Sequence, residues 1–424
     1  MLLLGLAHAA PPLPFELRPF GRVFFRPELT QNLSDYDSDA ADIGFVFALR
    51  GNLGVAASLP LDVDVVVDLN SYGLYALLLD AGPLDPEVRL YRGYVEARDL
   101  GNTPLDLRVG RAEVGTYGTG MLLSTDDFND GFSLEGLRLR WDTDRVVLDI
   151  MWNQLYADLT PAPDATVEEW GHPVLVGTHN TVRVSPGLSV DAYFWWMVYR
   201  PFAGYRATQT YVPGLRASGA GAGFDYSVEG TLQMGSAAGF NGTEADADAE
   251  VAAGNQDALF AYAVEPRVGY TLGRVRLGAR YYRASGDADA TDEKVGTFNH
   301  MWQDPHGRFG NLDHFVGSNI QFEGVEATWR LADGARASSL RSTAYALQAV
   351  EPGDNAHGAF DVAPATDAGT ALGVGADVSY RYLYSENLSF EFNVSAFQPG
   401  RYVTSTVGTG DTMFRAYIYM DAPF

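Results

Sequence analysis

The chain ends in Phe414-Arg415-Ala416-Tyr417-Ile418-Tyr419-Met420-Asp421-Ala422-Pro423-Phe424, and this stretch decides the fold. Its residues alternate between an apolar and a more polar set, and a period of two places such sets on opposite faces of a β-strand. The apolar face holds Phe414, Ala416, Ile418, Met420, Ala422 and Phe424, and the opposite face holds Arg415, Tyr417, Tyr419 and Asp421. In a soluble sandwich the apolar face would point into a core, and in a membrane barrel it would point to lipid. This strand alone allows both.

The same alternation recurs along the chain and separates the two options. Clear cases are residues 62–70, 224–234, 274–282 and 388–395. In each of them one face is apolar and the other carries charged or amide side chains, which a soluble core would not tolerate. Lipid on one side and water on the other satisfies both faces. A C-terminal phenylalanine that closes an apolar face also resembles the recognition signal of outer-membrane barrels.

Turn residues divide the chain into eighteen such strands. We predict strands at 16–30, 43–58, 62–73, 86–99, 104–115, 131–141, 145–157, 172–184, 188–199, 207–217, 224–234, 257–271, 274–285, 317–331, 336–349, 370–384, 388–398 and 411–424. The connections alternate short and long: Pro60-Leu61 and Gly273 are short, whereas 235–256, 286–316 and 351–369 are long. Short periplasmic turns and long extracellular loops are typical of outer-membrane barrels, and an even strand number places both termini in the periplasm. The prediction is an all-β, transmembrane antiparallel β-barrel of about 18 strands, because a propeller or a sandwich would not sort its loops by length in this way.

The composition agrees with one repetitive unit. The 424 residues include 46 glycines, 23 Phe, 23 Tyr and 7 Trp, and no shift in composition or Pro/Ser-rich linker divides them. We therefore predict a single barrel over residues 11–424. Residues 1–10 look like the remnant of a signal peptide, since a short apolar stretch leads to an Ala-x-Ala site at Ala7 to Ala9, without the usual basic segment before it.

Several classes of function are excluded by charge and residue usage. A balance of 29 basic against 54 acidic residues gives a net charge of −25, which would repel a nucleic acid. The absence of cysteine removes disulfides, thiolate metal sites and cysteine nucleophiles. No apolar run is long enough for a transmembrane helix. The histidines at 300, 306 and 314 match no zinc motif, and we expect no enzymatic activity, no cofactor and no metal.

Two long loops carry acidic runs, EADADAE at 244–250 and DADATDE at 287–293. Runs of this kind are usually solvated, and a divalent cation site is the alternative, because hard cations bind several carboxylate oxygens. No fixed calcium-loop spacing is present, so we assign no metal site to these loops, and the sequence leaves both interpretations open.

Arginine is the residue that points to a function. Lys294 is the only lysine, and arginine offers a planar fork of donors that suits carboxylates and phosphates, although codon bias in a GC-rich genome would have the same effect. By strand period the lumen receives Arg22, Arg26, Arg50, Arg92, Arg98, Arg108, Arg138, Arg140, Arg183, Arg267, Arg276, Arg280, Arg330 and Arg381. It also receives carboxylates, so the arginines either form neutralising cross-strand pairs or select anions as rings in a pore. Both can hold at once.

Residues 281–315 contain a series of short motifs. The segment YYRASGD at 281–287 ends a strand in a Ser-Gly-Asp turn, TFN follows at 297–299, and HGRFGNLD stands at 306–313. This series resembles the alginate-export family of outer-membrane barrels, in which a Ser-Gly-Asp-like turn leads to a Thr-Phe-Asn segment and a His-x-x-x-Gly-x-x-Asp element. LRVGR at 107–111, FSLEGLR at 132–138 and RVFFRPE at 22–28 also match. The resemblance is thus scattered over most of the barrel and is most specific over 281–315.

The resemblance implies a monomeric eighteen-stranded barrel that exports an anionic polysaccharide through an arginine-lined pore. By motif it makes Arg108, Arg111 and Arg138 pore candidates, together with Arg280 before the Ser-Gly-Asp turn. Arg111 departs from the strand period, because alternation from Val109 points it to lipid unless Gly110 forms a bulge.

We therefore expect a channel in the bacterial outer membrane that passes or exports an anionic solute, such as an alginate-like polysaccharide or another acidic saccharide. The alternative is a non-transporting structural or partner-binding barrel whose loops plug the lumen. The pore-lining candidates are Arg22, Arg26, Arg50, Arg92, Arg108, Arg111, Arg138, Arg140, Arg267, Arg276, Arg280 and Arg381. The expected partners are outer-membrane lipid, the saccharide or a small anion, and periplasmic export proteins.

Overall fold

The computed structural model describes residues 15–33, 36–37, 43–76, 87–125, 128–154, 174–199, 208–237, 257–289, 291–292, 294–354, 358 and 367–424. The predicted signal-peptide remnant at 1–10 and the acidic run at 244–250 lie outside the described residues. The strands are β1 (Glu16–Gln31), β2 (Gly44–Leu59), β3 (Val63–Ala76), β4 (Glu87–Ala97), β5 (Leu105–Glu113), β6 (Ser133–Asp142), β7 (Val146–Gln154), β8 (Val174–Ser185), β9 (Leu188–Tyr199), β10 (Thr208–Gly221), β11 (Phe224–Ala237), β12 (Asp257–Leu272), β13 (Val275–Ala284), β14 (Lys294–Val295), β15 (Ile320–Ala332), β16 (Ser338–Ala349), β17 (Ala371–Ser385), β18 (Leu388–Pro399) and β19 (Met413–Pro423).

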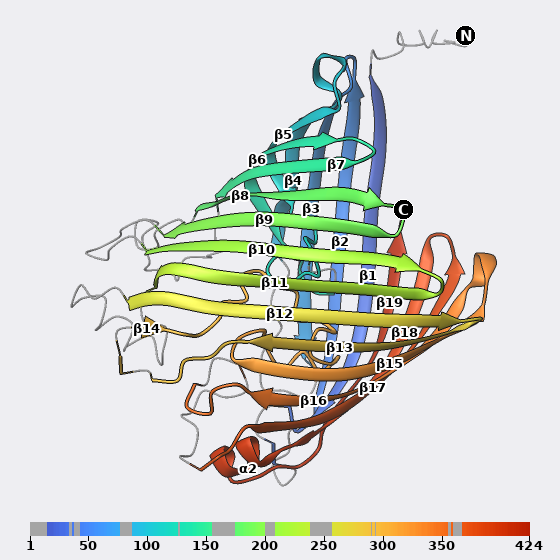
Figure 1. Cartoon of the computed structure of the whole chain (residues 1–424). Coiled ribbons are helices and arrows are strands. Elements are labelled where there is room, and N and C mark those ends of the chain that lie inside the picture. The colour runs from blue at the N-terminus through green and yellow to red at the C-terminus, as the bar shows by residue number, and fades with distance from the viewer. Residues whose placement is uncertain are drawn as a thin grey trace, which may run out of the picture.

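The long strands form one closed antiparallel barrel, as predicted (Figure 1). Each pairs with its neighbours in sequence, and β1 closes the ring by pairing with both β2 and β19, with Phe25 opposite Met420. All eighteen predicted strands are present, and their ends differ from the prediction by at most four residues. The two-residue β14 was not predicted, and it pairs in parallel with the first residues of β12.

The two faces of the wall follow the predicted alternation. Outward valines such as Val67, Val228 and Val394 are exposed, as lipid-facing side chains must be in a barrel without its membrane. Their inward neighbours Asp68 and Asn393 are buried. The polar inner face is therefore covered by other groups inside the barrel.

All short turns lie at the end of the barrel that also holds the C-terminus, and the long loops lie at the other end (Figure 1). Two of the turns contain short 3-10 helices, η1 (Leu100–Asn102) and η2 (Gly334–Arg336). The α-helix α2 (Arg401–Val407) stands at the loop end. By the habit of outer-membrane barrels, the turn end is periplasmic. Within the described residues, no helix is long and apolar enough to cross a membrane.

Two of the loops fold back into the barrel instead of remaining outside it. Apolar side chains from residues 114–123 and 298–315 are buried in one cluster with inward residues of the wall. The cluster members from these two loops are Val114, Met121, Leu122, Leu123, Phe298, Phe309, Leu312 and Phe315. Fully burying one such side chain contributes about 1.5–3 kcal/mol, so this cluster holds the loops firmly in the lumen.

Candidate functional site

The two inward loops form one body, which we call the plug: residues 114–125 and 297–315. Leu123 and Trp302 form a parallel β-bridge between them. The backbone N–H of Ser124 donates to the Trp302 carbonyl at 3.0 Å, and the N–H of Trp302 donates to the Leu122 carbonyl at 3.0 Å. The side-chain amide of Gln303 donates to the Met121 carbonyl at 2.7 Å. The loops therefore support each other inside the barrel.

The segment that resembles the alginate-export motif, residues 306–313, fixes the plug to the wall. His306 Nδ1 lies 2.8 Å from a carboxylate oxygen of Asp313. Arg415 on β19 donates to the same carboxylate at 2.6 Å. Gly310, at φ 95°, packs on the ring of Tyr345 so closely that an added Cβ would lie 2.0 Å from the Tyr345 hydroxyl oxygen. The motif therefore has a structural role that its sequence did not reveal.

Electrostatics strengthen this attachment. Burial alone would raise the pKa of the Asp313 carboxyl, but His306 and Arg415 together hold it below its usual range. Nearby, burial and the charge of Arg308 lower the pKa of His300 to about 4. His300 is therefore neutral at physiological pH, and its Nδ1 lies 3.0 Å from the Ser318 hydroxyl.

A polar cavity of about 410 Å³ lies between the plug and the wall formed by β12 to β17. A cavity of this volume is in the range of small-ligand sites. Its charged lining residues are Arg267, Arg276, Arg280, Arg308 and Arg341, with Asp304, Glu326, Asp377 and His306. Thr116, Thr119, Ser124, Thr125, Thr343 and Ser379 add hydroxyl groups.

Three of these arginines converge on one carboxylate. Glu265 on β12 is fully buried and lies 2.6 Å from Arg267, 2.5 Å from Arg280 and 2.5 Å from Arg308. A single carboxylate cannot neutralise three guanidinium groups, so positive charge remains around Glu265, while Asp304, Glu326 and Asp377 line other parts of the cavity. Arg280 Nη2 and Arg308 Nε also have no hydrogen-bond partner within the described part of the chain.

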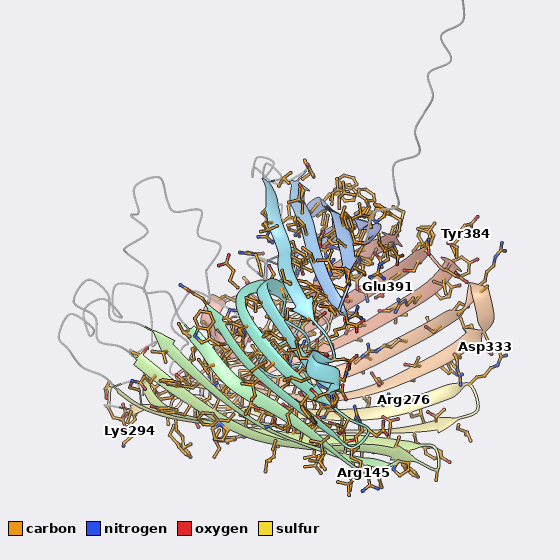
Figure 2. The ribbon with its side chains drawn as sticks, turned by 90° about the horizontal axis from the view of Figure 1, so that it is seen from above. Arg145, Arg276, Lys294, Asp333, Tyr384 and Glu391 are labelled. Carbon is orange, nitrogen blue, oxygen red and sulfur yellow. The ribbon has the colours of Figure 1, made fainter. Side chains whose placement is uncertain are left out.

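The arginines become less exposed from the turn end toward the plug. Arg341 and Arg276 stand near the starts of β16 and β13, at the periplasmic side, and share Glu326. Figure 2 shows Arg276 between Asp333 at the turn end and Lys294 at the loop end. The exposed fraction of the side chain is 56% at Arg341 and falls to 7% at Arg308 on the plug. A solute from the periplasm would therefore meet the accessible guanidinium groups first.

The comparisons with known proteins agree with this architecture. A family model described as "Alginate export" matches residues 85–415. The chain belongs to the alginate export family.

Solved structures of porin-like barrels share the fold. The chain superposes on Pseudomonas aeruginosa OpdQ with a TM-score of 0.58 at 11% identity, covering 97% of both chains. It superposes on OccK5 (OpdH) of the same organism with a TM-score of 0.56 at 11% identity, covering 96% of this chain and 98% of that one. The outer membrane protein OprD, also from P. aeruginosa, gives 0.55 at 11% identity, covering 96% and 93%. No curated protein sequence matches the chain.

The alginate export family and the barrel place the protein in the bacterial outer membrane. Both are those of transport channels and not of enzymes. Within the described residues, no group of three or more His, Cys, Asp or Glu side chains could hold a metal ion.

Only three of the predicted arginines line the large cavity, namely Arg267, Arg276 and Arg280. Seven others lie on β1 to β6 and are held by their own partners. These are Arg22 with Asp421, Arg26 with Glu28, Arg50 with Asn52 and the Asn129 carbonyl, Arg92 with Asp68, Arg108 with Glu96, Arg138 with Asp149, and Arg140 with Asp142. Arg381 on β17 is exposed and, among the described residues, forms no ion pair. The wall therefore consists mainly of neutralising pairs, which was one of the two expectations.

Arg111 lies on the outer face and not in the lumen. It is opposite Glu135 in the register of β5 and β6, on the same face as the exposed Val109 and Leu137. Its Nη1 lies 3.7 Å from Glu135 Oε1. Gly110 has a φ of 125°, but the pairing with β6 continues through it without a bulge. The strand period placed this residue better than the motif did.

Sequence reasoning did not single out Arg308, Arg341 or Arg415. Arg308 and Arg415 are central to the site, because one joins the plug to Glu265 and the other joins β19 to the plug. Arg415 was placed on the inner face by its period, which was the available signal. Arg308 lies in a loop, where no period indicates direction.

Proposed function

We propose that this outer-membrane channel passes an anionic solute, and that an acidic saccharide is its substrate class. One observation carries the proposal: Arg267, Arg280 and Arg308 share the single carboxylate of Glu265 at the edge of the cavity. Fixed positive charge in a narrow aqueous path lowers the barrier for anions. The hydroxyl groups of the lining suit a sugar, since each can donate to or accept from a sugar hydroxyl.

The mechanism needs no chemical step. Guanidinium groups bind carboxylates through two parallel hydrogen bonds. Arg276 lies between the wall carboxylates Asp225 and Glu326, whereas Arg267, Arg280 and Arg308 have one carboxylate between them. A carboxylate could therefore replace water at the exposed Arg341 first, then at Arg267 and Arg280. Family membership supports the saccharide assignment, because the family is described by alginate export.

The test is the reversal potential of single channels in a planar bilayer under a potassium chloride gradient. We expect chloride to be preferred over potassium in the unmodified channel. Arg267→Gln should reduce that preference, because Arg267 is the most accessible member of the group that shares Glu265. Arg108→Gln is the matched control, since Arg108 has its own carboxylate in Glu96 at 2.7 Å. A cation preference in the unmodified channel would refute the proposal.

The plug supports the second candidate, a non-transporting barrel whose loops fill the lumen. Its apolar side chains pack against inward residues of the wall in one buried cluster. Conductance separates the two candidates directly, since a permanently plugged barrel would show no steps of ion current above the leak of the bilayer.

A further inference from the structure

The plug has one part that differs from the rest in its bonding: its tip, residues 118–120. The bulk of the plug is fixed by buried apolar side chains such as Leu123 and Phe315. The tip is Gly118-Thr119-Gly120, with φ values of 62° and 77° at the two glycines. It has almost no apolar surface to bury, so polar contacts hold it in place.

Apart from the backbone bond from the Gly120 N–H to the Tyr117 carbonyl at 2.9 Å, those contacts converge on Thr119. Its N–H donates to Glu229 Oε2 at 2.5 Å, and its hydroxyl donates to Glu265 Oε2 at 3.0 Å. Its carbonyl oxygen accepts from Arg267 Nη2 at 3.1 Å and from Arg308 Nη1 at 3.1 Å. Four charged side chains, two carboxylates and two guanidinium groups, therefore each form a hydrogen bond with this one neutral residue.

The carbonyl of Thr119 is the weak point of this arrangement. Two guanidinium groups donate to a neutral acceptor there, while Glu265, the carboxylate with which both are paired, also serves Arg280. A guanidinium that donates to a carboxylate gains the Coulomb attraction of two opposite charges and can form two parallel bonds, and a neutral carbonyl offers neither. A carboxylate that enters the cavity can therefore compete with the Thr119 carbonyl for both donors.

We propose that the tip is a gate released by the transported anion. The solute carboxylate accepts hydrogen bonds from Arg267 Nη2 and Arg308 Nη1 in place of the Thr119 carbonyl. Thr119 then leaves its position between Glu229 and Glu265, which we call its seat. The flanking glycines allow this local movement while the apolar part of the plug stays in place. Displacement opens a path past Glu229, which then loses the Thr119 N–H and keeps the Tyr193 hydroxyl as a donor at 2.9 Å. Because Glu229 is nearly fully buried, losing the Thr119 N–H is unfavourable, and the tip returns when the anion has left.

The inference rests on the proposed function in one respect: the anion that opens the gate is also the solute. The mobility of the tip and the sign of the selectivity are nevertheless measured separately. The chain has no cysteine, and each variant is first tested for folding by its heat-dependent mobility on a gel.

The experiment records single channels of the full-length protein in potassium chloride, with and without potassium glucuronate at constant ionic strength. Neutral glucose serves as the control for the sugar ring. We expect glucuronate, and not glucose, to add a state of higher conductance. A fall in current with glucuronate and no added state would show simple block and would overturn the inference.

Gly118→Ala tests the seat itself. A Cβ at Gly118 would lie 2.5 Å from Glu229 Oε2, so the variant should hold the tip away from its seat. We expect the higher conductance without glucuronate and loss of the glucuronate-dependent step. Gly101→Ala is the matched control, because Gly101 has nearly the same φ, 63°, and a Cβ there meets nothing within 4 Å. Gly101→Ala should behave like the unmodified channel.

Glu229→Gln tests the same seat without a steric change. It keeps the shape of the side chain and weakens its bond to the Thr119 N–H, so the higher conductance should appear at lower glucuronate. Asp191→Asn removes the same charge from the neighbouring wall, where Asp191 pairs with Arg216 at 3.2 Å, and should leave the glucuronate response unchanged. Wild-type responses in both Gly118→Ala and Glu229→Gln would show that the tip is a fixed part of the wall. If the gate responds as expected in a cation-selective channel, the proposed selectivity fails and the gate stands.

Discussion

Arg415 on the last strand of the barrel binds Asp313 of the plug at 2.6 Å, across 102 positions of sequence. The same guanidinium donates to Glu28 on β1 at 2.9 Å. One side chain thus joins the two strands that close the barrel to the loop that fills it. All three residues are largely shielded from solvent.

Arg415→Gln should therefore strongly destabilise the folded barrel. Removing the cation leaves Asp313 with His306 and Glu28 with Arg26 as their remaining ion-pair partners. Breaking a buried ion pair costs up to about 3–5 kcal/mol. The measurement is the temperature at which the compact, fast-migrating form is lost on a gel. Arg274→Gln is the control, because its pair with Asp333 at 3.2 Å is exposed on both sides and such pairs contribute about 0–1 kcal/mol. Equal melting of the two variants would show that Arg415 does not anchor the plug.

Phe424 should be required for assembly. Its backbone N–H and carbonyl both bond to Gly21 of β1, at 2.9 and 2.8 Å, and its ring lies over that glycine. Replacing Phe424 with aspartate should lower the amount of folded protein in the outer membrane, because it removes the apolar end of the strand that closes the barrel. Unchanged levels of folded protein would contradict this.

Gly21→Ala tests the same contact between the first and last strands from the side of β1. A Cβ at Gly21 would lie 2.3 Å from the Phe424 ring and 2.8 Å from the Asn52 carbonyl oxygen, so assembly should decrease. Gly51→Ala on the adjacent strand meets nothing within 4 Å and should assemble normally. Quantifying the heat-resistant band in membrane fractions compares the two variants directly.

Acid should loosen the plug through His300. Its pKa is lowered to about 4 in place, whereas an exposed histidine titrates near 6.5. The folded plug binds fewer protons than a released one between these values, so its stability is full above about pH 6.5 and is lost as pH falls toward 4. This lowering of the His300 pKa corresponds to about 3 kcal/mol of stability of the folded plug. Limited proteolysis of the loop at 297–315 should accelerate between pH 6.5 and 4, and His300→Gln should remove most of that dependence.

The sequence predicted the wall of the barrel well because a strand has a strict period. Alternation placed Arg276 and Arg280 inward, and the eighteen strands follow it closely. Arg111 shows the strength of this signal, since the period contradicted the motif and the structure agrees with the period. The strand period alone allowed each inward arginine to be listed. The partner of each arginine depends on the register between neighbouring strands, and the turn residues in the sequence indicate that register only approximately.

The plug could not be derived in the same way. Residues 306–313 were recognisable as a motif, yet nothing in them indicates that Arg308 reaches Glu265 on a strand 43 residues earlier. Thr119 is an ordinary residue in a loop, and its role comes only from the charged side chains that surround it. Loops have no period, so their direction is decided by long-range packing.

Selectivity should persist as salt concentration rises. The acidic loops would repel anions at the mouth, but exposed charges are largely screened above about 0.1 M, where the Debye length is about 10 Å. Arg280 on the wall and Arg308 on the plug line the cavity between them and are only slightly exposed, so salt screens them much less. The ratio of chloride to potassium permeability should therefore remain constant or increase from 0.05 to 1 M salt, a range of about twentyfold. Arg267→Glu combined with Arg280→Glu should weaken or reverse the ratio at every salt concentration. A ratio that falls to unity at high salt in the unmodified channel would assign the selectivity to surface charge and not to the arginines that share Glu265.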